Sequence, residues 1–218
     1  MAPSSPSFLC LTADVVSSRA HPGSAQRLRQ AAERVNARRA QGLAVPFSVT
    51  VGDEVQALFV DAEAALEAEL DLRLLLFPLR LHCGLGVGPV EGPIEDRTGG
   101  MQGECFLRSR EALAEAKRHG DGLTWISSGN PPLDDAANAC FLALAAVEAR
   151  WTEKQARALE AVREVGTQVQ AARRLGISQP SLHLRLKAAH AGPYLEARGR
   201  LARFLTASHL PDDGRGGD

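Results

Sequence analysis

The chain contains no run of about 18 uncharged apolar residues, the length that a membrane-spanning helix needs. Residues 1–7 have neither the basic start nor the apolar stretch of a signal peptide. Its four cysteines are widely separated and lack the paired spacing of a zinc site; they are Cys10, Cys83, Cys105 and Cys140. These absences argue against membrane insertion, export and a zinc centre, and they predict a cytoplasmic protein with reduced thiols.

Charge is unevenly distributed along the 218 residues, although the formal net charge is only −1. Residues 150–204 hold 11 Lys or Arg against 4 Asp or Glu, whereas residues 1–149 hold 13 against 19. A hydrophobic content of 44% can fill one good core or two small ones, and the charge asymmetry favours two. We expect a domain over residues 1–149, a second domain over residues 150–210, and a disordered tail over residues 211–218.

The basic segment has the helix start and stop signals of a helix-turn-helix. Thr152 is placed to cap a first helix that Gly166 ends, and Thr167 opens a second. Gly176 ends the second helix, and Ser178 caps a third. Clustered positive charge is also the electrostatic footprint of phosphate binding. The alternative is an ordinary helical hairpin whose outer face is solvated.

The third helix predicts DNA recognition, because its outer face is polar and basic. The side chains expected at base edges or phosphates are Gln179, Ser181, His183, Arg185 and Lys187. A single unit of this kind covers only a few base pairs, so a homodimer on double-stranded DNA is expected. The leading hypothesis from the sequence is a DNA-binding protein that acts as a transcriptional regulator.

The acidic part predicts an α+β fold. Strands are expected over residues 8–16, 47–51, 55–60, 79–87 and 123–126, and helices over residues 19–41, 62–76 and 103–118. This order is βαββαβ with an αβ extension. A ferredoxin-like sheet backed by helices buries the apolar faces of such elements.

Two aspartates fall where strands of this sheet end. Asp14 lies near the end of the first strand, and Asp53 lies at the tip of the hairpin Gly52-Asp53-Glu54. Neighbouring carboxylates repel one another, and Mg²⁺ or Mn²⁺ relieves that repulsion. Two other interpretations stay open: Asp14 caps the helix that follows it, and Gly-Asp-Glu is only a tight, solvated turn, which is favoured for Glu54.

Two further features of the acidic part have structural interpretations. The glycines at 84, 86 and 88 indicate a strand that bends or packs closely against a neighbour. His82 lies on an apolar strand with no second His or Cys at ligand spacing, so it is interpreted as a core histidine.

The element order, with Asp14 on the first strand and Asp53 on the hairpin, resembles the catalytic domain of class III nucleotidyl cyclases and GGDEF proteins. The resemblance implies that Asp14 and Asp53 hold divalent metal ions, Mg²⁺ or Mn²⁺, on a nucleoside triphosphate. It supplies the alternative hypothesis, a metal-dependent nucleotidyl cyclase-like enzyme.

A closer resemblance, to the SatD family, covers nearly the whole chain. It is carried by Asp14–Arg19 (DVVSSR), Thr50–Gln56 (TVGDEVQ), Gly84–Gly88 (GLGVG), Ser109–Leu113 (SREAL) after Gly103, and Trp151–Gln155 (WTEKQ). The resemblance implies a cyclase-like domain joined to a C-terminal helix-turn-helix. Ala13 departs from the family pattern, because a glycine commonly precedes the aspartate.

The departures from true cyclases concern the groups that stabilise the transition state. The resemblance places Leu107 where an asparagine is expected and Glu111 near an expected arginine. Arg108 and Arg110, on the same helix, are the candidates to bind the nucleotide in their stead. With no catalytic residue identified, the sequence favours a degenerate domain that dimerises or senses a nucleotide, and it leaves enzymatic activity open.

Overall fold

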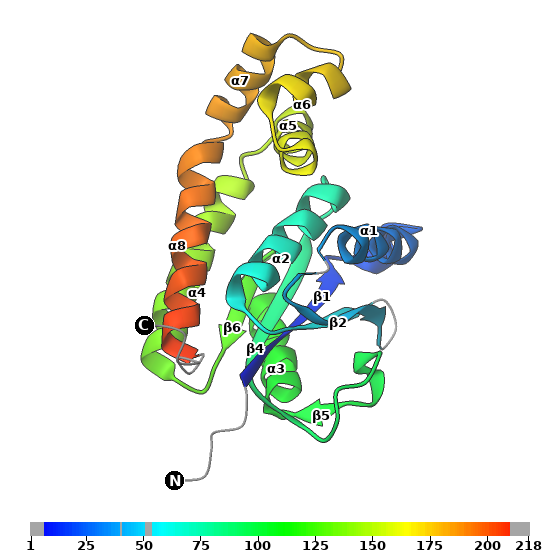
Figure 1. Ribbon diagram of the computed structural model, residues 1–218, viewed down its shortest axis with the longest axis vertical. Helices are drawn as coiled ribbons and strands as arrows, with labels where there is room; N and C mark the ends of the chain where they lie inside the picture. Colours follow the sequence, from blue (N-terminus) through cyan, green and yellow to red (C-terminus); the bar gives the residue numbers. More distant parts are fainter. Residues whose placement is uncertain (1–6, 40, 51–53, 210–218) are drawn as a thin grey trace, which may run out of the picture.

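The computed structural model describes residues 7–39, 41–50 and 54–209 (Figure 1). The strands are β1 (Ser7–Val15), β2 (Leu43–Val49), β3 (Val55–Phe59), β4 (Leu81–Glu91), β5 (Gln102–Gly103) and β6 (Thr124–Ser127). The α-helices are α1 (Ser24–Arg38), α2 (Ala62–Leu76), α3 (Glu104–His119), α4 (Pro131–Glu148), α5 (Glu153–Val165), α6 (Gln168–Arg174), α7 (Gln179–Ala188) and α8 (Ala191–His209). Two short 3₁₀ helices are η1 (Ser18–Ala20) and η2 (Thr98–Gly100). Asp53 and the predicted tail over residues 211–218 lie outside the described residues.

The six strands form one curled, mainly antiparallel sheet in the order β2-β3-β1-β4-β5, with β6 parallel to β4. Strand β1 lies in the middle and runs antiparallel to both β3 and β4. The first six elements other than η1 follow the order β1, α1, β2, β3, α2, β4. The prediction of an α+β fold is therefore confirmed.

Helices cover both faces of the sheet, and β1 alternates between them. Its residues Leu9, Leu11, Ala13 and Val15 face the hydrophobic core beneath α1 and α2. Its residues Cys10, Thr12 and Asp14 face α3 on the opposite side. Because side chains alternate along a strand, Asp14 is directed toward α3 rather than toward the main core.

Helix α3 packs directly on β4 because glycines occupy the contact. A Cβ atom at Gly84 would lie 2.1 Å from the carbonyl oxygen of Ser109, and one at Gly86 would lie 2.1 Å from that of Cys105. No side chain fits at such distances, so only glycine allows this approach. The predicted close packing is confirmed, and it fixes the position of α3 over the sheet.

In the part of the chain that forms the sheet, three element boundaries differ from the prediction by four residues or more. Helix α1 begins at Ser24 rather than residue 19, because Pro22 and the left-handed Gly23 (φ 81°) interrupt the chain after η1. Strand β2 begins earlier, at Leu43, and tolerates Pro46 because β2 is an edge strand with register shifts. Strand β4 continues four residues beyond the predicted end, to Glu91, because its glycines permit packing rather than ending the strand.

The C-terminal helices begin and end where the sequence indicates. Thr152 and Gln155 form a capping box at α5, and Gly166 ends that helix with φ 81°. Side chains of Thr167 and Ser178 cap α6 and α7. Helix α8 then runs beside α4 (Figure 1) and packs on α2. One hydrophobic cluster continues from the sheet through α5 to α8, and the division near residue 150 stays a prediction.

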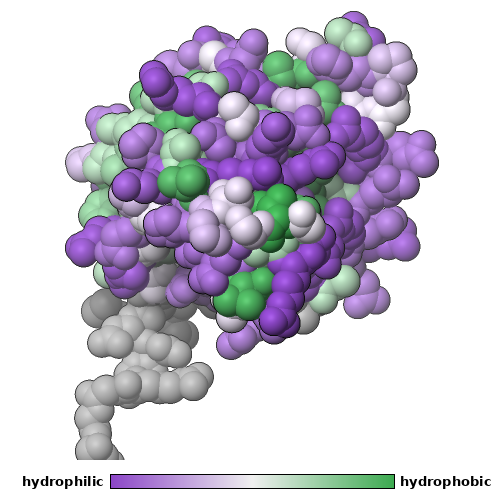
Figure 2. All heavy atoms as spheres, turned by 90° about the horizontal axis from the view of Figure 1, so that it is seen from above, coloured by the Kyte–Doolittle hydropathy of each residue, from purple (hydrophilic) through white to green (hydrophobic). Residues whose placement is uncertain are grey.

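The surface at the α5–α7 end is mainly hydrophilic, with separate hydrophobic residues scattered over it (Figure 2). Two exposed apolar side chains in these helices are Val169 of α6 and Leu184 of α7. Among the described helices, none combines the length and the apolar character that crossing a bilayer requires.

Candidate functional site

Two carboxylates and one ammonium meet at the end of β1. Asp14 is the penultimate residue of β1, and Glu54 directly precedes β3, whose first residue Val55 pairs with Ala13. Lys117 lies in the last turn of α3. Its Nζ lies 2.5 Å from Asp14 Oδ2 and 3.6 Å from Glu54 Oε1. A single ammonium group is thus shared by two carboxylates that come from adjacent strands.

Two buried polar atoms at this place have no hydrogen-bond partner in the described structure, namely Asp14 Oδ1 and His82 Nδ1. His82 lies opposite Asp14 on β4, so its side chain is on the same face of the sheet. The residue is only 7% exposed. Burial, followed by the charge of Lys117, lowers the pKa of His82, which keeps the imidazole neutral.

The charge of Lys117 is stabilised by its partners. Partial burial acts to lower its pKa, but the hydrogen bond and charge of Asp14, with a further contribution from Glu54, raise it above the ordinary value of 10.5. Lys117 is therefore a permanent cation at neutral pH. We define Asp14, Glu54, His82 and Lys117 as the acidic-end cluster.

A buried set of hydrogen bonds holds the strands and α3 in register beside this cluster. Gln56 Nε2 of β3 donates to Thr12 Oγ1 of β1 at 2.9 Å, and Thr12 Oγ1 lies 3.0 Å from Ser109 Oγ of α3. Ser109 also donates to the Phe106 carbonyl oxygen. All three polar side chains are buried, so their mutual satisfaction fixes how α3 lies over β1 and β3.

The cluster suits a cation in its donor chemistry. The oxygens of Asp14 and Glu54 converge on one cation position, and Asp14 keeps a second oxygen without a partner. Carboxylate oxygens are the ligands that Mg²⁺ and Mn²⁺ prefer. Within the residues that the structure describes, however, no group of three or more His, Cys, Asp or Glu is arranged to hold a metal ion. These residues can therefore supply part of a coordination shell.

The structure decides between the interpretations of Asp14 and Glu54 that the sequence left open. Asp14 pairs with Lys117 and makes no helix cap within the described residues, so the capping interpretation is wrong. Glu54 is not a freely solvated turn residue, because its side chain is only 30% exposed and faces Lys117. Lys117 was missed by sequence reasoning, since nothing local marks a lysine 103 residues from its partner. Asp53 lies outside the described residues.

The two arginines predicted to bind a nucleotide are placed differently on α3. Arg108 donates from Nη1 to the Val87 carbonyl oxygen at 2.6 Å, and its Nη2 pairs with Glu104 at 2.7 Å. Arg110 is exposed and lines a 360 Å³ surface cavity beside residues 99–103. Leu107, at the expected asparagine position, is 61% exposed in the same cavity.

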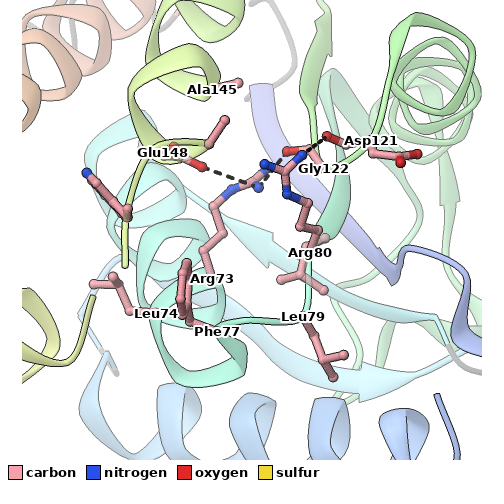
Figure 3. Close-up of a pocket in the computed structure, with 12 residues that line it drawn as sticks. Arg73, Leu74, Phe77, Leu79, Arg80, Asp121, Gly122, Ala145 and Glu148 are labelled. Carbon is pink, nitrogen blue, oxygen red and sulfur yellow. Dashed lines mark hydrogen bonds and ion pairs between the residues drawn. The ribbon is translucent and has the colours of Figure 1, made fainter. Parts of the chain in front are cut away.

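A second charged cluster lies between α2, α4 and α8. Arg73 pairs with Glu69 and Glu148 and donates to the Gly122 carbonyl oxygen, as the close-up of this region shows in part (Figure 3). Arg198 pairs with Glu69 from the other side. The cavity beside Arg73 measures only 50 Å³. Because its cations are already paired, this cluster is a structural network rather than a ligand site.

The five side chains predicted to contact DNA lie on α7. Four are exposed and one, Arg185, is half-buried; the four are Gln179, Ser181, His183 and Lys187. Leu182 and Leu186 face inward, as the predicted apolar stripe requires.

The family described as "SatD family (SatD)" matches residues 8–205 of the chain. Among solved structures, an adenylate cyclase from Trypanosoma brucei in its monomeric state is similar, with 16% identity and a TM-score of 0.42 over 57% of this chain and 75% of that chain. The catalytic core of a rhodopsin-guanylyl cyclase with converted specificity has 15% identity and a TM-score of 0.41 over 58% of this chain and 81% of that chain. A bacterial light-regulated adenylyl cyclase has 16% identity and a TM-score of 0.38 over 51% of this chain and 71% of that chain. No curated protein matches the chain.

These findings correct the leading hypothesis from the sequence. The family that the chain matches over residues 8–205 is SatD, and this match gives no evidence of DNA binding, so the prediction of a DNA-binding transcriptional regulator with a DNA partner is wrong. The charge argument behind it also fails physically. Arg163 and Arg198, counted as phosphate-binding charge, are 9% and 3% exposed and pair with Asp71 and Glu69 of α2. Two of the eleven basic residues in the segment 150–204 are therefore neutralised inside the molecule.

Proposed function

Since the chain belongs to the SatD family, we propose that it is a metal-dependent nucleotidyl cyclase-like enzyme that acts on a nucleoside triphosphate. The observation that carries the proposal is the convergence of Asp14 and Glu54 on a single cation position at the end of β1. A divalent ion at carboxylates of this kind binds phosphate oxygens and stabilises the charge that develops during phosphoryl chemistry.

Asp14 is proposed to hold Mg²⁺ or Mn²⁺ together with Asp53 of the adjoining hairpin. Arg110 is proposed to contact the phosphates, because it is exposed on α3, two helical turns or about 10 Å along the axis from Lys117. Arg108 is the second candidate, and binding a phosphate would require its guanidinium to leave the Val87 carbonyl. Positive charge of this kind supplies the electrostatic stabilisation that Leu107 and Glu111 do not offer.

The finer architecture belongs to the same proposal. Residues 1–149 are assigned to a ferredoxin-like, cyclase-like domain and residues 150–210 to a helical domain of helix-turn-helix type. The helical domain acts as a scaffold, because Arg163 of α5 and Arg198 of α8 bind carboxylates of α2. A homodimer is proposed through the cyclase-like domain, whose α3 exposes the apolar Leu107.

The test is incubation with ATP or GTP and Mn²⁺, followed by chromatographic analysis of cyclic nucleotide and pyrophosphate. We expect Asp14→Asn and Asp53→Asn to abolish product formation, because each removes an anionic ligand. Asp135→Asn is the matched control, since Asp135 is exposed on α4. Absence of product from both triphosphates would contradict the proposal. A melting temperature that neither triphosphate nor Mn²⁺ raises would show in addition that neither ligand binds, because a ligand of the folded state must stabilise it.

A further inference from the structure

We infer that Lys117 is a tethered counter-ion: its ammonium occupies the cation position between Asp14 and Glu54 and must leave before a divalent ion binds. The inference rests on the proposed function, because it concerns metal binding at the same site. It adds that α3 itself supplies a competitor for the metal, so that Lys117 sets the affinity of the site.

The distances carry the first step. Lys117 Nζ lies 2.5 Å from Asp14 Oδ2, so the ammonium takes the position of a cation that would bind this oxygen. Glu54 Oε1 lies 3.6 Å from the same nitrogen. An ammonium group and a divalent ion both need these oxygens, and like charges at such separation repel strongly. Lys117 and a metal ion placed between Asp14 Oδ2 and Glu54 Oε1 therefore compete for the same position.

The remaining side chains of the acidic-end cluster carry the second step, since they indicate a ligand beyond Lys117. Asp14 Oδ1 and His82 Nδ1 are buried and have no hydrogen-bond partner in the described structure. Leaving polar atoms unsatisfied is costly, and such atoms are usually explained by water, an ion or a catalytic role. Lys117 satisfies only one oxygen of Asp14, whereas an ion with several coordination positions can engage more of these atoms.

The third step is that the Lys117 side chain can move whereas Asp14 is held within the sheet. Its side chain is 39% exposed and begins in the last turn of α3. Asp14 is only 15% exposed and is fixed within β1 between β3 and β4. A lysine side chain has a flexible four-carbon stem, so its ammonium can reach solvent by bond rotation, without movement of the helix.

The experiment measures Mn²⁺ binding to the full chain by electron paramagnetic resonance, without nucleotide. We expect Lys117→Met to tighten the dissociation constant about tenfold or more, because it removes a unit positive charge a few ångströms from the ion. Lys117→Arg keeps the charge and should bind no more tightly than wild type. Lys154→Met, at an exposed lysine of α5, is the matched control and should leave the affinity unchanged. Asp14→Asn in the Lys117→Met background should abolish the gain.

Equal or weaker Mn²⁺ binding by Lys117→Met, in a variant whose circular dichroism spectrum matches wild type, overturns the inference. Lys117→Gln is a second neutral variant, to be used if Lys117→Met does not fold, and it should bind Mn²⁺ more tightly than wild type by the same factor. Failure of the proposed function reads out separately: tighter Mn²⁺ binding without conversion of ATP or GTP supports the inference and contradicts the enzyme. Product formation without tighter binding supports the enzyme and contradicts the inference.

Discussion

Arg198 of α8 and Glu69 of α2 form a fully buried ion pair, with 2.5 Å between Nη2 and Oε2, although 129 residues separate them. Arg198 also donates to the Leu66 carbonyl oxygen, and Arg73 approaches the second oxygen of Glu69. The Arg198 guanidinium lies over the ring of Tyr194, whose hydroxyl donates to Glu148 of α4 at 2.5 Å. The C-terminal helix α8 is therefore bound to α2 and α4 by a buried polar network and not only by apolar packing.

Removing one member of this network should be strongly destabilising. Arg198→Met leaves Glu69 and the hydroxyl of Tyr194 with fewer partners in a buried place, and we expect a loss of about 3–5 kcal/mol in the free energy of unfolding. For a chain of this length, that lowers the melting temperature by roughly 10 °C. Arg200→Met is the control, because Arg200 pairs with Glu196 at the surface. Equal melting temperatures for the two variants would contradict the role of the network.

The network also predicts how stability depends on pH. Burial alone would raise the pKa of Glu69, but Arg73 and then Arg198 lower it to about 2, against an ordinary value of 4.5. A carboxyl whose pKa is depressed by folding contributes stability that is fully present above pH 4.5 and is lost as the pH falls from 4.5 toward 2. The difference in unfolding free energy between wild type and Glu69→Gln should therefore shrink across that range.

Urea denaturation at several pH values measures that difference. Glu196→Gln serves as the control, since Glu196 is 59% exposed and its contribution should stay near zero throughout. A Glu69→Gln difference that stays constant from pH 6 to about pH 3 would show that Glu69 is not held ionised by its partners.

Local structure was readable from the sequence because its causes are local. Helix α2 has the predicted bounds, Ala62–Leu76, and its N-cap Asp61 accepts from Ala64. Thr152 and Gly166 delimit α5 through a capping box and a left-handed glycine. In each case the signal lies within a few residues of the structure that it specifies, so one sequence is sufficient to detect it.

The ion pairs that define the candidate site join residues far apart in the sequence, so they could not be predicted from local signals. Lys117 and Asp14 meet only because β4 glycines bring α3 onto the sheet, and their ion pair leaves no sequence pattern. For the same reason, Arg163 looked like DNA-binding charge although it is paired with α2. Helix α4 was missed although Pro131 stands at its start. Charge counts along a chain do not distinguish a paired side chain from a free one.

The glycines of β4 provide a test of how α3 is positioned. Gly84→Ala places a Cβ atom 2.1 Å from the Ser109 carbonyl oxygen and 2.4 Å from the Leu113 nitrogen, so α3 must shift. We expect the free energy of unfolding to fall by about 3 kcal/mol, which is at the upper end of the usual cost of overpacking a core. Gly192→Ala is the matched control, because nothing lies within 4 Å of its Cβ position in α8, and it should be neutral or stabilising. Equal stabilities would contradict direct contact between α3 and β4.

Thiol labelling checks the same contact by an independent route. Cys140 is exposed on α4, whereas Cys10, Cys83 and Cys105 are buried, and burial raises their pKa values to about 12. Because the thiolate is the reactive form, one thiol per native chain should react rapidly with Ellman's reagent, and four should react after unfolding. Cys140→Ser should remove the rapid phase. Cys10 of β1 and Cys105 of α3 lie in the buried cluster between α3 and the sheet, so Gly84→Ala should make both react faster. Rapid labelling of more than one thiol in the wild-type chain would show that α3 is not closed over the sheet.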